Sequence, residues 1–318
     1  MLSQELRAAS QIVALVGLVF SLLMLIPWAA SVLTGWAGGE SFLWSGLTTG
    51  LACSLVMVSG WGDRPRVSTR FGVIVVNMLW WVLPIICAIP LMNSNENFSF
   101  VDSLFEATSG LTTTGSTIVT DLVHQSRPVL LWRAIMQWVG GLGILSLGLI
   151  LLPFLRVGGM QLFRMESSDR SEKPLPRLIE ISKSIIIIYV VLSVLCSIGY
   201  LSVGMSPFDA LTHAMTTVST GGFSTHDESL GYYEGWHVLW VAIIFMIAGA
   251  LPFSFFIAIF FARNLPRYDP QIAVFFTLII LSCAIVLFAD GWDHAKNFTQ
   301  FSQYIFNVIS ILTTTGYA

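Results

Sequence analysis

Long runs without a charged residue alternate along this chain with short polar stretches. A helix needs about 20 apolar residues to cross the roughly 30 Å hydrocarbon core of a bilayer. Because lipid offers the backbone no hydrogen-bond partner, runs of this kind are predicted to be helical. The pattern therefore predicts an all-α, polytopic membrane protein with seven full spans, at residues 8–39, 41–62, 71–95, 134–155, 184–208, 235–262 and 270–289.

Three short stretches of mixed apolar and hydroxyl residues end in almost the same letters. Each contains threonine two residues before a glycine, and glycine reaches backbone angles that other residues avoid. Successive carbonyls can then face one axis, as in filters where backbone carbonyls replace the water around a cation. One copy alone is weak, because Thr and Gly are frequent in packed membrane helices. We predict a K⁺ filter of three segments, Thr113-Thr114-Gly115-Ser116, Thr220-Gly221-Gly222-Phe223 and Thr314-Thr315-Gly316-Tyr317.

The three segments belong to an internal repeat of about a hundred residues. The glycines Gly115, Gly222 and Gly316 are 107 and 94 residues apart, and the residues upstream of them fall into register. Such self-similarity should be recognised before a fold is named. Each unit is predicted as span, short helix, filter segment and span, with the short helix and filter re-entering the membrane. The boundaries are 1–68 for two additional N-terminal spans, 69–165 for pore unit one, 166–265 for a cytoplasmic loop and pore unit two, and 266–318 for a partial pore unit three.

The short helices have recognisable starts. Ser99 and Ser206 each stand three residues before an acid, Asp102 and Asp209. A serine N-cap followed by an acid in the first turn stabilises a helix start. The third unit has glutamines there, which predicts a weaker cap. The other end of each helix points into the membrane, where its partial negative charge favours a cation.

A polar residue stands nine positions before each glycine: Glu106, His213 and Asn307. Two interpretations are open for these side chains. They could contact the ion path electrostatically, or they could be polar partners packed behind the filter. In either case a polar group inside the membrane is costly. With the two capping acids, we expect these residues to support the pore helices.

Charge and composition give the orientation and exclude other classes. The chain has 10% charged residues, against about 25% for a soluble domain. With a cytoplasmic N-terminus, 12 of the 15 Lys and Arg residues fall inside, which fits the positive-inside rule. The five histidines lack ligand spacing, and no span carries a nucleophile with its base. We expect no enzyme, no bound metal other than K⁺ and no nucleic-acid partner.

The chain also contains four longer motifs: Phe105-Glu106-Ala107-Thr108-Ser109-Gly110-Leu111, Gln137-Trp138-Val139-Gly140-Gly141-Leu142-Gly143, Val157-Gly158-Gly159-Met160-Gln161-Leu162 and Thr220-Gly221-Gly222-Phe223-Ser224-Thr225-His226-Asp227. Together they resemble the membrane subunit of Trk/Ktr-type potassium transporters, the TrkH group in particular. The resemblance implies potassium uptake across the inner (cytoplasmic) membrane through a pore of four non-identical units. It also implies a homodimer and a cytosolic nucleotide-binding ring, which we expect to dock on the loop 156–183. In that family, serine in place of the first filter glycine is associated with Na⁺ passage.

The chain departs from the family pattern after its third filter segment. A fourth unit and the second span of unit three are missing, so we expect an incomplete form with an incomplete pore. Two alternatives remain open: a secondary transporter of another class, or a non-conducting structural membrane fragment. Inverted repeats would favour the former, but the inside loops follow units one and two alike.

Overall fold

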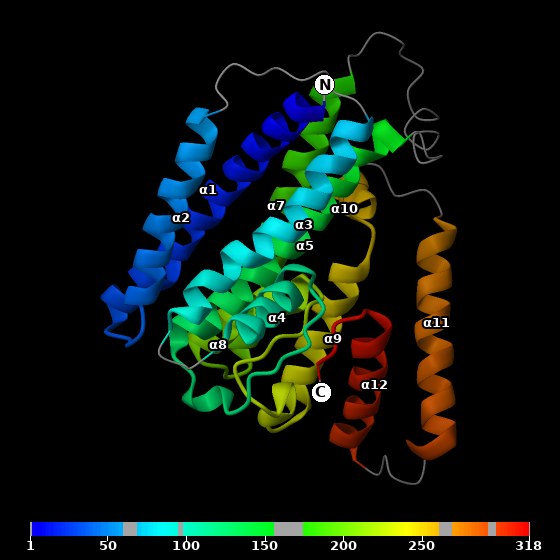
Figure 1. Cartoon of the computed structure of the whole chain (residues 1–318). Helices are drawn as coiled ribbons and strands as arrows, with labels where there is room; N and C mark the ends of the chain where they lie inside the picture. The colour runs from blue at the N-terminus through cyan, green and yellow to red at the C-terminus, as the bar shows by residue number, and fades with distance from the viewer. Residues whose placement is uncertain are drawn as a thin grey trace.

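The computed structural model describes residues 2–59, 69–94, 98–155, 174–260, 269–291 and 297–317. Within these ranges the chain is helical and forms no strand (Figure 1). The long helices are α1 (Leu2–Thr34), α2 (Glu40–Ser59), α3 (Thr69–Met92), α5 (Arg127–Leu155), α7 (Pro174–Ser202), α9 (Trp236–Ala250) and α11 (Pro270–Val286). The short ones are α4 (Phe100–Leu111), α8 (Pro207–Val218), α10 (Phe253–Phe260) and α12 (Phe298–Leu312), with single turns η1 (Leu122–His124), η2 (Ser229–Tyr232) and η3 (Leu287–Gly291).

The predicted all-α, polytopic membrane architecture is confirmed. Five helices are each long and apolar enough to cross a bilayer, namely α1, α2, α3, α7 and α11. The predicted span 235–262 is broken into α9 and α10, which meet at an angle of 92°. Pro252 lies at the break and cannot donate a backbone hydrogen bond, which ends α9. The remaining predicted span, 134–155, lies in α5, whose side chains are described as far as Gly143.

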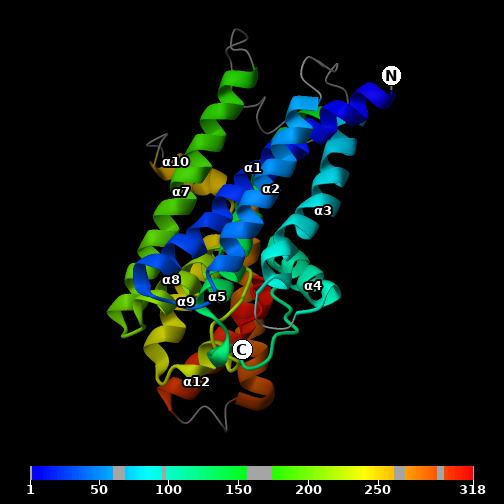
Figure 2. The same ribbon diagram turned by 60° about the vertical axis from the view of Figure 1, so that its left-hand side comes forward.

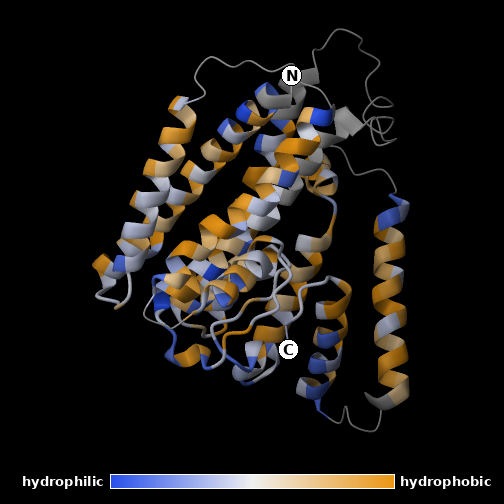
Figure 3. Ribbon diagram, in the orientation of Figure 1, coloured by the Kyte–Doolittle hydropathy of each residue, from blue (hydrophilic) through white to orange (hydrophobic). Residues whose placement is uncertain are grey.

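The three short helices α4, α8 and α12 lie at the end of the molecule opposite the N-terminus (Figures 1 and 2). Helix α4 packs against α3 and α5, α8 packs against α5, α7 and α9, and α12 packs against α9 and α11. Helix α8 therefore touches α5, the long helix that follows α4, and α12 touches α9, the long helix that follows α8. Helix α11 stands at the edge of the molecule and is apolar along most of its length (Figure 3).

The predicted helix starts are confirmed for α4 and α8. Ser99 accepts a hydrogen bond from the amide of Asp102, and the Asp102 carboxylate accepts one from the amide of Ser99. Ser206 caps α8 in the same way through the amide of Asp209, with Pro207 in the first turn. At the start of α12, Asn297 makes no side-chain cap bond, as the weaker sequence signal predicts.

Two glycines let the long helices approach the ends of α4 and α8. A Cβ atom added to Gly140 of α5 would overlap the carbonyl oxygen of Leu111, the last residue of α4. One added to Gly249 of α9 would lie 2.7 Å from the carbonyl oxygen of Val218, the last residue of α8. Close helix packing, rather than a hinge, therefore accounts for Gly140.

Candidate ion-filter segments

The backbone takes the same course in all three predicted filter segments. The residue two before each glycine has a positive φ, 55° at Thr113, 51° at Thr220 and 60° at Thr314. The glycines themselves have φ values of 80°, 77° and 81°. The residue between them has no positive φ in any segment, so residues with a positive φ alternate with residues that lack one. Alternation of this kind turns successive N–H groups to one side of the backbone and the carbonyls to the other.

The N–H groups of the segments turn back toward their own short helices. The amide of Thr114 donates to the carbonyl of Ser109, and that of Gly221 donates to the carbonyl of Thr216, each at 2.9 Å. The amide of Thr315 donates to the carbonyl of Ser310, also at 2.9 Å. These bonds satisfy the last carbonyls of each helix, which have no partner within it.

The segments converge although they lie far apart in the sequence. A Cβ atom built on Gly115 would overlap the carbonyl oxygen of Gly221 and lie 3.6 Å from that of Thr315. One built on Gly222 would overlap the Thr315 carbonyl. At both positions a residue other than glycine is therefore disfavoured for two reasons, the positive φ and the contact of its Cβ atom with a neighbouring carbonyl. A Cβ atom built on Gly316 would meet no heavy atom within 4 Å in the part of the chain that the structure describes, apart from the adjacent residues.

Most carbonyl oxygens of the segments have no protein donor. The exceptions are the carbonyl of Gly221, which accepts a hydrogen bond from Gln137 Nε2 at 2.7 Å, and the carbonyl of Tyr317, which accepts one from Ser310 Oγ at 2.8 Å. Carbonyls without a protein partner need water or a cation instead. Within the described ranges, no hydrogen bond reaches the carbonyls of Thr113, Thr114, Gly115, Thr220, Gly222, Thr314, Thr315 and Gly316.

The residue after the glycine is aromatic in the second and third segments, and its ring packs against a helix. The hydroxyl group of Tyr317 lies 2.6 Å from the Thr216 hydroxyl and donates to the carbonyl of His213, both on α8. Phe223 is 3% exposed and lies under the guanidinium of Arg133 of α5, 4.1 Å from ring centroid to Cζ. Ser116 is exposed. The aromatic side chains of Phe223 and Tyr317 thus pack behind the segments.

Glu106 lies behind the first segment in a buried ion pair. Its Oε1 atom accepts a hydrogen bond from Arg133 Nε at 2.7 Å, and both side chains are 1% exposed. The same oxygen accepts from the hydroxyl of Thr117, two residues after Gly115. Arg133 also donates to Thr117 Oγ1 and to the carbonyl of Ser224. The buried guanidinium of Arg133 therefore joins the chain just after the first segment, at Thr117, to the chain just after the second, at Ser224.

His213 occupies the corresponding place behind the second segment. Its Nε2 atom lies 3.0 Å from the hydroxyl of Ser224, two residues after Gly222. This repeats the contact between Glu106 and Thr117. Asn307, at the third equivalent position, is exposed, whereas Glu106 and His213 are buried. The geometry places Glu106 and His213 as polar partners behind the segments.

Asp209 links the start of α8 to the chain beyond the second segment. Its carboxylate accepts hydrogen bonds from the hydroxyls of Ser206 and Thr225, each at 2.7 Å. Burial raises the pKa of this carboxyl, but those hydrogen bonds and the nearby His213 and His226 outweigh it, so the pKa lies below its ordinary value. His226 Nε2 lies 3.8 Å from the carboxylate.

Gln137 appears in the sequence only as part of a family-like motif, and the sequence does not predict that Gln137 or Arg133 contacts the filter. Both lie on α5 and are almost completely buried. The signal was present, because a charged or amide side chain within a membrane helix is costly unless it has a specific partner. The identity of that partner requires the fold, since it lies 84 residues away for Gln137.

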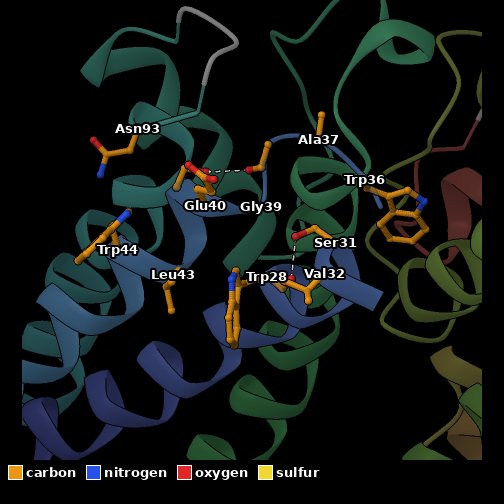
Figure 4. Close-up of a pocket in the computed structure, with 12 residues that line it drawn as sticks. Trp28, Ser31, Val32, Trp36, Ala37, Gly39, Glu40, Leu43, Trp44 and Asn93 are labelled. Carbon is orange, nitrogen blue, oxygen red and sulfur yellow. Dashed lines mark hydrogen bonds between the residues drawn. The ribbon is translucent and has the colours of Figure 1, made fainter. Parts of the chain in front are cut away.

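A groove lies elsewhere in the described part of the molecule. It has a volume of about 990 Å³ and is formed where α1 ends and α2 begins. Three tryptophans line it, Trp28, Trp36 and Trp44, together with Glu40 (Figure 4). Tryptophan is enriched where membrane helices meet water, and these three tryptophans lie where two long apolar helices are joined.

Together, the fold and the converging segments define a polytopic helical membrane protein with repeated short helices and carbonyl-rich loops. The family model of TrkH, described as a cation transport protein, matches residues 49–318. The chain therefore belongs to the TrkH family, which confirms the resemblance seen in its motifs. The family description is that of transport proteins.

The relatives and one solved structure agree with this assignment. The Trk system potassium uptake protein TrkI of Halomonas elongata is 37% identical, over 97% of this chain and 63% of its own length. TrkH of Escherichia coli K12 is 32% identical, over 98% of this chain and 66% of its own length. The crystal structure of the potassium transporter TrkH from Vibrio parahaemolyticus matches with a TM-score of 0.88 and 29% identity, covering 98% of this chain and 65% of that chain. The chain thus spans about two thirds of the length of these relatives.

Proposed function

We propose that this chain supplies three filter segments to a potassium-uptake protein of the Trk type. The observation that supports this most directly is the convergence of three segments that share the same alternating backbone and in which most carbonyls have no protein donor. In such a filter, carbonyl oxygens replace the hydration shell of the ion. The C-terminal ends of α4, α8 and α12 add partial negative charge toward the same region.

The topology supports parallel pore units rather than inverted repeats. The three short helices lie at the same end of the molecule, whereas inverted repeats would place corresponding elements at opposite ends (Figure 1). We propose the units 69–165, 166–265 and 266–318, preceded by the additional spans in 1–68. Glu106, His213, Asp102 and Asp209 then hold the first two filter segments and their helices in place.

We further propose an inner-membrane location with a cytoplasmic N-terminus. The distribution of Lys and Arg supports this orientation, and the short helices then re-enter from the outside. A homodimer and a cytosolic nucleotide-binding ring on the loop 156–183 follow from the family resemblance. Residues 156–173 of that loop lie outside the described residues.

Growth of potassium-uptake-deficient cells on low K⁺ tests the transport proposal. The complete gene should restore growth, and the Gly115→Ser variant should reduce the preference for Rb⁺ over Na⁺ uptake by about tenfold. The reason is that a side chain at Gly115 meets a positive φ of 80° and the carbonyl of Gly221.

Gly143→Ser is the matched control, because a Cβ atom there has no heavy atom within 4 Å among the described residues. It should leave uptake and ion preference unchanged. Absence of rescue by the unaltered gene, or an unchanged preference in Gly115→Ser, would contradict the proposal.

A further inference from the structure

The second segment differs from the other two at its middle residue. Segments one and three have Thr114 and Thr315 there, whereas segment two has Gly221. The backbone does not demand glycine at this place, because Gly221 lacks the positive φ of Gly222. A side chain is excluded for another reason. A Cβ atom on Gly221 would lie 2.5 Å from Cδ and 2.6 Å from Oε1 of Gln137.

Gln137 fills the space that a side chain at residue 221 would need. It comes from α5, is fully buried, and grips the segment at two points. Its Nε2 atom donates to the carbonyl of Gly221 at 2.7 Å, and its Oε1 atom accepts from the amide of Phe223 at 3.0 Å. The side-chain amide thus pairs with the backbone on both sides of Gly222, much as another peptide group would.

The other segments are braced by hydroxyl groups instead. The hydroxyls of Thr112 and Thr114 lie 2.8 Å apart, and those of Thr313 and Thr315 lie 2.8 Å apart. Segment two cannot form this pair because it has no side chain at residue 221. Gln137 therefore replaces an internal brace with one that comes from a different helix.

Arg133, one turn before Gln137 on α5, also binds the chain of the second segment. Its Nη1 atom donates to the carbonyl of Ser224 at 3.0 Å, and its guanidinium lies over the Phe223 ring. The two side chains stand four residues apart, which places them on one face of the helix. This face of α5 holds the backbone from residue 221 to residue 224.

We propose that Gln137 is a positioning residue that sets the ion preference of the second filter segment. By fixing residues 221 and 223, it fixes the carbonyl of Gly222 that stands between them. Discrimination between K⁺ and Na⁺ depends on the spacing or field strength of such carbonyls. A released segment would lose its preferred spacing. This inference rests on the proposed transport function.

The first test replaces the amide while keeping the length of the side chain. In cells that depend on the complete gene for potassium, Gln137→Met should lower the ratio of Rb⁺ to Na⁺ initial uptake by about tenfold, as loss of two hydrogen bonds predicts. Ser193→Ala is the control, because it removes the bond from the indole of Trp138, the neighbouring residue of α5, without touching a segment. It should leave the ratio unchanged.

A double-mutant cycle gives a readout that loss of stability would not produce. Gly221→Ala should lower the ratio on its own, because the added methyl group displaces the Gln137 amide. In a Gln137→Ala background there is room for that methyl group, so Gly221→Ala should cause little further change. Non-additivity of this kind identifies the contact itself, even if Gln137→Met accumulates poorly.

The outcomes separate this inference from the transport proposal. If the unaltered protein takes up K⁺ and Gln137→Met keeps its ion ratio, the positioning role is overturned and transport stands. Additive effects of the Gly221 and Gln137 substitutions would also overturn it. If the unaltered protein takes up no K⁺, both proposals fail together.

Discussion

Arg133 shows what a single buried charge can organise within a membrane helix. Its guanidinium is satisfied by the carboxylate of Glu106, a hydroxyl of Thr117 and the carbonyl of Ser224. Burial of one charge without its partner is strongly unfavourable, whereas replacing both members of a pair can be nearly neutral. The pair therefore contributes less to net stability than to the placement of the two chain segments that it joins.

Glu106→Gln should lower stability by about 3–5 kcal/mol, because it leaves the Arg133 charge buried without a counter-charge. The double variant Glu106→Gln, Arg133→Met should cost less than the two single changes together. Thermal unfolding of the purified protein in detergent measures this. Arg7→Met serves as the control, since Arg7 is exposed. An unfolding temperature of Glu106→Gln equal to that of the unaltered protein would rule out the argument.

At the level of elements, the helix starts were readable from the sequence, whereas the sharpness of the bend in the sixth span was not. Ser99 and Ser206 act within three residues of chain, so local chemistry decides their geometry. Pro252 signals a break in a helix, but the 92° angle between α9 and α10 depends on what they pack against. The side chains that hold the segments could not be predicted either, because Gln137 and Gly221 are far apart in the sequence and come into contact only in the fold.

Ser99→Ala and Ser206→Ala should each weaken their helix start by about 1 kcal/mol, since each removes the acceptor for an otherwise unpaired amide. Hydrogen exchange at the amides of Asp102 and Asp209 should become correspondingly faster. Asn297→Ala is the internal control, because Asn297 makes no side-chain cap bond to α12. Equal acceleration in all three variants would argue against a capping role.

Across the whole molecule, the three segments meet through a few side chains and a set of carbonyls. Glycine spacing predicted that they correspond to one another, and the shared φ pattern shows the same backbone in each. Their mutual packing could not be predicted, because it depends on how α8 and α12 dock on the helices of the preceding units. A cation held by carbonyls from several segments would link parts of the chain that are about a hundred residues apart.

The purified product of the complete gene should therefore unfold at a higher temperature in K⁺ or Rb⁺ than in Na⁺. A ligand at 100 times its Kd stabilises the folded state by about 2.7 kcal/mol. The experiment holds ionic strength constant and changes only the cation. The Gly115→Ser variant should show a smaller difference between the two ions. Equal unfolding temperatures in K⁺ and Na⁺ would count against a K⁺ site in the filter.

The reach of Tyr317 back to α8 has a consequence for how the protein is made. Its hydroxyl group contacts Thr216, His213 and Thr217, all completed about a hundred residues earlier in synthesis. Phe223 likewise settles against Arg133 of the preceding unit. During translation the second and third segments thus meet side chains that are already made, whereas Gly115 meets the carbonyls of Gly221 and Thr315 only after those residues follow. The order in which the ribosome delivers the segments is also an order in which they can dock, so insertion into the membrane and closure of the filter can proceed together.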